Sequence, residues 1–331
     1  MIKFNYFKKQ FAICVTTVIG LLLTSCAAVS DTKVLYFAHS LPTSHPVHKG
    51  ILDMQSILNE KSGGKLQIKV FPDGQLGSER EVLELLQIGS IAITKVSASA
   101  LSNFAPEYQL TVVPYLFRDD AHLWRNLEGE VGEQLLSSGS EYLLRGLCFY
   151  DAGARSFYTK EKPINSPDDL TGLKLRVQND QMSVSMANTL GASATPMAFS
   201  ELYTALQQNV VDGAENNIPS FVTSNHFEVC KYYTFDEHTM IPDVVIIGTK
   251  FWNRLSEQEK EWLLTASKES VVKQKIYWKE TIAEQMEMLK KNGVKFFYPD
   301  KKPFQIKSKP VMENLMKDPQ MKALIDKINA N

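Results

Sequence analysis

The sequence predicts an α/β protein with two similar lobes and one long helix that spans them. Short apolar strands and amphipathic helices alternate from residue 34 to residue 96, and a second alternation of the same kind starts after Tyr150. A helical run without Pro or Gly then extends from about residue 256 to residue 292. Alternating strands and helices at this spacing predict parallel sheets with helices on their faces.

The first alternation contains three strands and two helices. We expect strands at 34–39, 66–71 and 91–96 and helices at 45–61 and 78–88. Ser78 and Glu81 have the spacing of a capping box, which indicates where the second helix begins. Gly89 follows the last helical residue, a position that glycine often occupies at helix ends.

The second alternation is shorter and leads into the long helical run. We expect a strand at 173–177, helices at 182–190 and 199–209, and a strand around Ala214. Ser256 and Glu259 repeat the capping-box spacing at the start of the long run. About 37 residues would extend roughly 55 Å as one helix. The apolar positions of this run do not keep a strict heptad, which favours a helix lying across two lobes over a coiled coil.

The N-terminal segment has the features of an export signal. Three lysines and no acid precede an uncharged apolar run at 11–26. This run is short of the about 20 apolar residues that span a bilayer, so a signal peptide over residues 1–25 fits better than the alternative of a membrane anchor. Residues 23–26 resemble a lipobox, which predicts lipidation of Cys26 and tethering by acyl chains. Ordinary cleavage one or two residues later is the alternative.

Composition and motifs give no indication of an enzyme or of a nucleic-acid partner. The 331 residues carry a formal net charge of −1 and no basic stripe. Nucleophile elbows, phosphate-binding loops, dinucleotide fingerprints and common zinc motifs are all absent from the sequence. His226, Asp236 and His238 match no known zinc spacing, so we expect neither a metal nor a cofactor. We expect Cys148 and Cys230 to be buried free thiols, with a disulfide between them as the alternative.

Two arginines lie in otherwise apolar strand segments. Arg176 follows Leu173 and Leu175, and Arg155 precedes Ser156 and Phe157. Strand alternation puts Leu173 and Leu175 on one face and Arg176 on the other. Each arginine is compatible with a ligand-binding role, with a solvated charge or with a structural ion pair, and these residues alone do not distinguish the three.

Residues 172–177 and 191–213 together resemble the signature of the DctP-type solute-binding proteins of tripartite ATP-independent periplasmic (TRAP) transporters. Further similar segments lie at 74–79, 113–119 and 166–170, so the similarity follows the whole mature chain in order. The resemblance implies a two-lobed periplasmic binding protein fold, a periplasmic location, no cofactor, and TRAP membrane permease subunits as partners. We expect one lobe to contain 33–151 and 242–281, the other 152–241 and 282–331, and the spanning helix to cover about 256–292.

The resemblance also implies where an organic acid binds. Arg176 matches the family's invariant carboxylate contact, which a guanidinium makes through two charge-assisted hydrogen bonds. Arg155 matches a second arginine used by some members, and Asn216 matches a position that hydrogen-bonds the ligand acid. From the first lobe we expect contacts that form on closure, by His39, Glu79 and Ser97.

The sequence departs from the commonest family pattern at 214–220 and 236–238. Glu215, Asn217, Asp236 and His238 add polar groups that suit a polyhydroxylated ligand, and this variant resembles the branch associated with hexuronates such as glucuronate and galacturonate. The alternatives are a C4-dicarboxylate or sialic acid bound in the same way. A sensor-type binding protein that feeds a histidine kinase would have much the same sequence.

Overall fold

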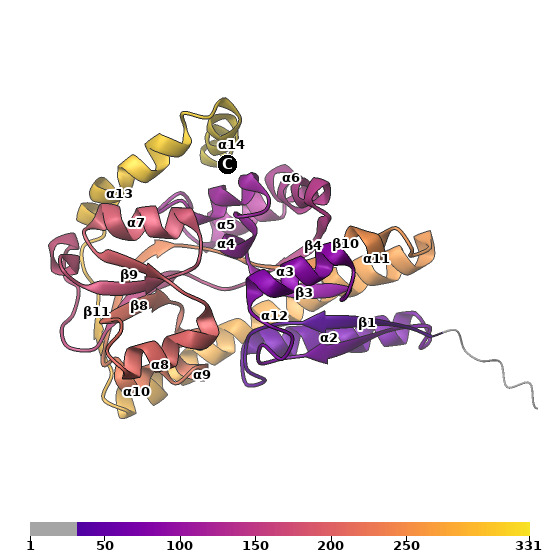
Figure 1. Cartoon of the computed structure of the whole chain (residues 1–331), viewed down its shortest axis with the longest axis horizontal. Coiled ribbons are helices and arrows are strands. Elements are labelled where there is room, and N and C mark those ends of the chain that lie inside the picture. The colour runs from indigo at the N-terminus through magenta and orange to yellow at the C-terminus, as the bar shows by residue number, and fades with distance from the viewer. Residues whose placement is uncertain (1–31) are drawn as a thin grey trace, which may run out of the picture. The chain divides into compact units, whose positions relative to one another are not determined.

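Two β-sheets organise the part of the chain that the computed structural model describes, residues 32–331 (Figure 1). The predicted signal peptide and the predicted lipidation at Cys26 fall outside the described residues. Residues 34–331 belong to one compact unit. We call the parts built on the two sheets the first lobe and the second lobe.

The first sheet consists of β1 (Lys33–Ala38), β2 (Leu66–Phe71), β3 (Ile93–Ser97), β4 (Leu144–Tyr150) and β10 (Asp243–Gly248). Their order is β2-β1-β3-β10-β4. β10 is antiparallel to both of its neighbours, so a strand from late in the sequence completes a sheet that starts at residue 33. All residues of β3 and β10 are buried. A charged side chain on either strand, such as Lys95 or Asp243, therefore needs a partner within the protein.

The second sheet consists of β5 (Arg155–Thr159), β6 (Lys174–Val177), β7 (Ser193–Pro196), β8 (Gly213–Asn216), β9 (Tyr232–Thr239) and β11 (Lys295–Phe297). Their order is β11-β9-β5-β8-β6-β7. Ser156 lies opposite Asn216, and Arg176 lies opposite Ala214. This register places Arg155, Arg176 and Asn216 on three adjacent strands.

The helices cover both sheets. They are α2 (Pro46–Lys61), α3 (Glu79–Ile88), α4 (Ala98–Leu101), α5 (Asp120–Leu127), α6 (Glu130–Ser138), α7 (Gln181–Leu190), α8 (Leu202–Gln207), α9 (Ile218–Thr223), α10 (His226–Val229), α11 (Thr249–Trp252), α12 (Glu257–Lys291), α13 (Lys302–Leu315) and α14 (Pro319–Ala330). Short 3₁₀ turns lie at Pro106–Val112, Gly139–Tyr142, Pro167–Leu170 and Phe199–Glu201. Both predicted capping boxes are confirmed. Over residues 32–331, every helix is too short or too polar to cross a bilayer.

The long helix α12 confirms the predicted spanning element. It has 35 residues, packs along α2 and β4 of the first lobe, and reaches α9 of the second lobe (Figure 1). Trp278 belongs to the core beneath the first sheet, whereas Leu289 belongs to a core of the second lobe. At the crossing from β4 to β5, Gln274 receives a hydrogen bond from the Asp151 backbone N–H and donates one to its carbonyl, both 2.8 Å long. The helix therefore holds the connection between the lobes.

The two C-terminal helices pack in different places. α13 lies on α7 of the second lobe. α14 instead packs against α6 and the 3₁₀ turn at Pro106–Val112, where Leu324 and Ile328 enter the core of the first lobe. The Ile328 carbonyl also lies 2.9 Å from Nε2 of His122 on α5. The other lobe boundaries stay a prediction.

Candidate functional site

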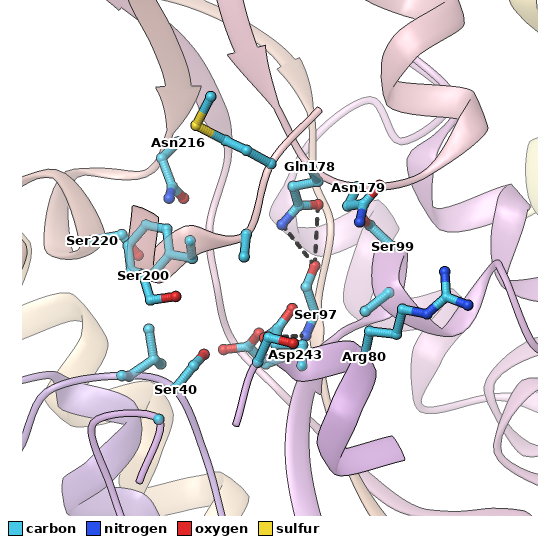
Figure 2. Close-up of a pocket in the computed structure, with 18 of the residues that line it drawn as sticks. Ser40, Arg80, Ser97, Ser99, Gln178, Asn179, Ser200, Asn216, Ser220 and Asp243 are labelled. Carbon is cyan, nitrogen blue, oxygen red and sulfur yellow. Dashed lines mark hydrogen bonds between the residues drawn. The ribbon is translucent and has the colours of Figure 1, made fainter. Parts of the chain in front are cut away.

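A cavity of about 410 Å³ is lined by residues of both lobes. This volume is in the usual range of small-molecule sites, about 300–1,000 Å³. The lining is mostly polar, and its fully or partly buried charged residues are Glu79, Lys95, Arg155, Arg176 and Asp243. Figure 2 shows Ser97 and Gln178 in contact beside the cavity, with Asp243 near Ser97 and Asn216 on the other side.

Arg176 presents a guanidinium that is only partly used by the protein. It lies on β6 and is 3% exposed, and its Nε and Nη2 donate to the Met197 carbonyl at 3.1 and 2.9 Å. Its Nη1 is buried without a hydrogen-bond partner in the described structure. Burial lowers the pKa of Arg176 from its ordinary value, although the charge of Glu215 opposes this. A buried cationic donor that lines a cavity and lacks a partner is suited to bind an anion.

Arg155 also lines the cavity, and most of its N–H groups already have partners. Its Nε and Nη2 donate to the two carboxylate oxygens of Glu215 at 2.5 and 2.9 Å, and its Nη1 donates to Asn216 at 2.9 Å. Arg155 therefore positions Glu215 and Asn216. Its role as a second contact of the ligand carboxylate stays a prediction.

Glu215, Asp236 and His238 lie behind the cavity lining, in one buried network with Arg155. His238 Nδ1 is 2.7 Å from Asp236 Oδ2, and its Nε2 is 3.6 Å from Glu215 Oε2. Burial favours neutral His238, but Asp236 and Glu215 outweigh it and raise the pKa of His238 to about 9. Burial likewise opposes the charge on Glu215, but Arg155 and His238 lower its pKa to about 2. The network thus contains two cations and two anions.

The position of this network differs from the predicted ligand contacts. Glu215, Asp236 and His238 are not among the residues that line the cavity, and they are held to one another, to Arg155 and to the Phe157 N–H. His39 does not line it either. Its Nε2 lies 2.9 Å from His48 Nδ1, its Nδ1 accepts from the Leu41 N–H, and burial lowers its pKa to about 3. These four residues support the cavity wall.

The other predicted residues line the cavity. Asn216 accepts hydrogen bonds on its side-chain oxygen from Arg155 and from the Asn217 N–H, which leaves its NH₂ group for a ligand. Asn217 caps α9 through the Ser220 N–H. In the first lobe, Glu79 accepts from the Ser97 N–H at 3.0 Å.

Sequence reasoning missed two buried charged residues of the cavity, Lys95 and Asp243. Lys95 Nζ is 3.1 Å from Asp243 Oδ1 and 3.5 Å from Glu79 Oε1, and all three residues line the cavity. Burial and the neighbouring Glu79 raise the pKa of Asp243 to about 6, although Lys95 opposes this. The signal was present, since each residue is a lone charge in an apolar strand, the pattern that singled out the two arginines.

Three hydrogen bonds join the lobes directly beside the cavity. Gln178 Nε2 donates to Ser97 Oγ at 3.1 Å, the Ser99 hydroxyl donates to Asp180 at 2.7 Å, and Asn103 donates to the Asn179 carbonyl at 2.9 Å. We call them the inter-lobe bonds. They connect the end of β3 and the residues that follow it with the segment after β6. Neither β3 nor β6 belongs to the crossing from β4 to β5.

The described part of the chain contains no group of His, Cys, Asp and Glu that could hold a metal ion. Cys148 and Cys230 are buried free thiols, as predicted. The cavity lining supplies hydrogen-bonding groups and charged groups, which suit the binding of a polar, charged small molecule.

Comparisons with known proteins agree with this arrangement. A solved TRAP periplasmic solute-binding protein from Xanthobacter autotrophicus Py2, with bound β-D-galacturonate, is 37% identical with a TM-score of 0.87 and covers 89% of this chain and 99% of its own. One from Anaerococcus prevotii, with bound D-glucuronate, is 36% identical with a TM-score of 0.88, covering 90% and 98%. The C4-dicarboxylate-binding protein DctB of Bacillus subtilis is 31% identical over 82% of this chain and 77% of its own.

These structural neighbours share the two-lobed α/β architecture described above. The model of the DctP family, described as bacterial extracellular solute-binding protein family 7, matches residues 37–318. The chain belongs to this family of extracellular solute-binding proteins.

Proposed function

We propose that this protein captures a hexuronate outside the cytoplasm and delivers it to the membrane permease of a TRAP transporter. The observation that carries the proposal is the buried Nη1 of Arg176, an unpaired cationic donor in a polar cavity. The ligand carboxylate binds this donor and the NH₂ group of Asn216. The remaining lining supplies hydroxyl and amide groups, such as Ser97 and Gln178, for the ligand hydroxyls.

The solved relatives support the sugar acid. Both structures compared above hold a hexuronate, and both cover nearly all of this chain at more than 35% identity. The B. subtilis relative binds C4-dicarboxylates, so succinate and malate form the competing ligand class.

Capture depends on closure of the lobes over the ligand. The ligand favours the closed form only to the extent that it binds that form more tightly. The permease subunits then receive the ligand from the closed form. We also propose that the mature chain is held at the membrane by lipid on Cys26. Mass spectrometry of the native protein tests this, since an unmodified N-terminus at or beyond Ala27 would rule it out.

A ligand panel tests the substrate class. Glucuronate and galacturonate should raise the melting temperature of the purified protein more than succinate or malate at equal concentration. At a ligand concentration of about 100 times Kd, the ligand should stabilise the folded protein by about 2.7 kcal/mol. Sialic acid belongs in the same panel. Stronger stabilisation by a C4-dicarboxylate, or none by either uronate, would contradict the assignment.

A further inference from the structure

Two carboxylates and one ammonium form a charged cluster on the first-lobe wall of the cavity. Lys95 on β3 is 2% exposed and reaches Asp243 on β10 and Glu79 on α3, as described above. Two negative groups and one positive group leave this cluster with a formal charge of −1.

The second lobe presents the opposite charge. Arg155 is neutralised by Glu215 through a bidentate pair, so it adds no net charge to the wall. Arg176 has no such partner. Among the fully or partly buried charged side chains of the cavity, the unpaired positive charge therefore lies on the second lobe and the excess negative charge on the first lobe.

Hydrogen-bonding capacity points in the same direction. Lys95 directs its ammonium to Asp243 Oδ1 and Glu79 Oε1. The second carboxylate oxygens of Asp243 and Glu79 take part in none of the hydrogen bonds found between described residues, and both residues line the cavity. Carboxylate oxygens accept hydrogen bonds from hydroxyl groups. They have nothing to offer a second carboxylate, which is also acceptor-only when ionised.

We propose that Glu79, Lys95 and Asp243 form a specificity subsite that binds the hydroxyl-bearing end of a sugar monocarboxylate and rejects a ligand with a second carboxylate. This inference rests on the proposed function, because it places the first carboxylate on Arg176. The proposed subsite also explains how the cavity would reject a dicarboxylate although three cationic side chains are buried around it. The negative cluster would repel the second carboxylate.

The test compares glucuronate with glucarate, which has a carboxylate at the end where glucuronate has its anomeric carbon. Isothermal titration of the wild-type protein should give glucarate a Kd at least about 100-fold higher, as expected for like charges near contact in a partly buried site. Asp243→Asn and Glu79→Gln each remove one negative charge and keep the side-chain shape. Each should reduce the glucarate-to-glucuronate ratio of Kd by at least about 10-fold.

The change in this ratio between variants reports the effect of the protein charge alone. Glucarate is an open chain and glucuronate forms a ring, but this difference between the ligands is the same for every variant. Asp168→Asn is the matched control: it makes the same charge change at an exposed ion pair with Lys307, outside the cavity, and should leave the ratio unchanged. Melting curves without ligand identify a variant that fails to fold. If one of Asp243→Asn and Glu79→Gln fails to fold, the ratio measured for the other one tests the subsite. Equal affinity of the wild-type protein for both ligands, or an unchanged ratio in the folded variants, would overturn the subsite. Wild-type protein that binds no uronate at all would instead reject the proposed function, on which the subsite rests.

Discussion

At the scale of single residues, Arg176 has the environment that most directly indicates a ligand. It is held in place by the Met197 carbonyl and retains one buried donor for the ligand. Arg176→Ala should weaken uronate binding by roughly 30-fold to several thousand-fold, which corresponds to about 2–5 kcal/mol for a buried charged pair. Arg176→Lys should recover little, because one ammonium cannot reproduce a planar fork that bonds both Met197 and the ligand.

The matched control for Arg176 is Arg80→Ala. Arg80 also borders the cavity, but its side chain is 69% exposed and pairs with Glu84 on the same helix. Its removal should change affinity by less than about 3-fold. Calorimetric titration and an apo melting curve distinguish the outcomes for Arg176. Unchanged affinity together with a lower melting temperature would show that Arg176 is structural.

His238 predicts a pH dependence of stability. Its pKa is about 9 in the folded protein, above the value of 6.5 for an unperturbed histidine. The folded state therefore binds the proton more tightly, and this contribution is complete below about pH 6.5 and lost as pH rises towards 9. At about 1.4 kcal/mol per pKa unit, this contribution amounts to about 3–4 kcal/mol at most.

Denaturant unfolding at pH 7 and at pH 10 measures this effect. The free energy of unfolding of the wild-type protein should fall over this interval, and that of His238→Gln should fall less. Identical pH dependence of the two proteins would mean that His238 is neutral when folded.

At the scale of elements, the contact between α2 and α12 is unusually close at Gly50. A Cβ placed on Gly50 would lie 2.7 Å from the Cβ of Gln274, the residue that holds the Asp151 backbone at the crossing. Helix propensity alone would make Gly50→Ala stabilising by up to about 1 kcal/mol. Overpacking costs about 1–3 kcal/mol and should win, so this variant should be less stable than the wild-type protein.

Ser56→Ala is the control for Gly50→Ala, since Ser56 is an exposed position of the same helix. It should leave stability within about 0.5 kcal/mol. Thermal unfolding of both variants provides the measurement. A Gly50→Ala variant as stable as the control would show that α12 shifts away from α2 without cost.

At the scale of the whole molecule, the inter-lobe bonds should bias the protein towards the closed form. Ser99 is 1% exposed, and its hydroxyl donates to Asp180, which is also buried. Ser99→Ala leaves Asp180 with one buried acceptor unpaired, a loss of about 1–2 kcal/mol. Uronate affinity should therefore fall by about 5- to 30-fold, mainly through faster dissociation.

Ser102→Ala is the matched control. Its hydroxyl donates to the Ser99 carbonyl within the same lobe, so its loss does not break contact between lobes. Stopped-flow dissociation should show a faster rate for Ser99→Ala alone. Equal dissociation rates of the ligand from the two variants would show that the inter-lobe bonds do not stabilise the closed form.

Much of the fold could be predicted because it is encoded locally. The strand at 66–71 is found at the predicted residues, and the capping boxes at Ser78 and Ser256 begin α3 and α12 as expected. The insertion of β10 between β3 and β4 and the packing of α14 on the first lobe could not be predicted in this way. Both depend on contacts between residues more than 90 positions apart, which local patterns do not encode.

The site was predicted only in part, because the sequence shows local signals but not the distant partners of a side chain. Arg176 stood out because a charge in an apolar strand is a local signal, and the family resemblance then implied its role as the carboxylate contact. Asp236 and His238 were expected to contact the ligand because they are polar and lie where the sequence departs from the commonest family pattern. Their partners Arg155 and Glu215 lie on other strands, so the sequence could not show that these charges are satisfied internally.

The late arrival of β10 and α14 has a consequence for how the chain acquires its structure. The first lobe starts at residue 33, yet its sheet is complete only when residues 243–248 pair and its core only when residues 319–330 pack. A nascent chain that ends before residue 243 lacks β10, the strand that joins β3 to β4. Such distant pairings are formed slowly, because loop closure must precede them. The N-terminal half of the chain therefore cannot complete the first lobe by itself. The first lobe reaches its full tertiary structure only when almost the entire polypeptide is present.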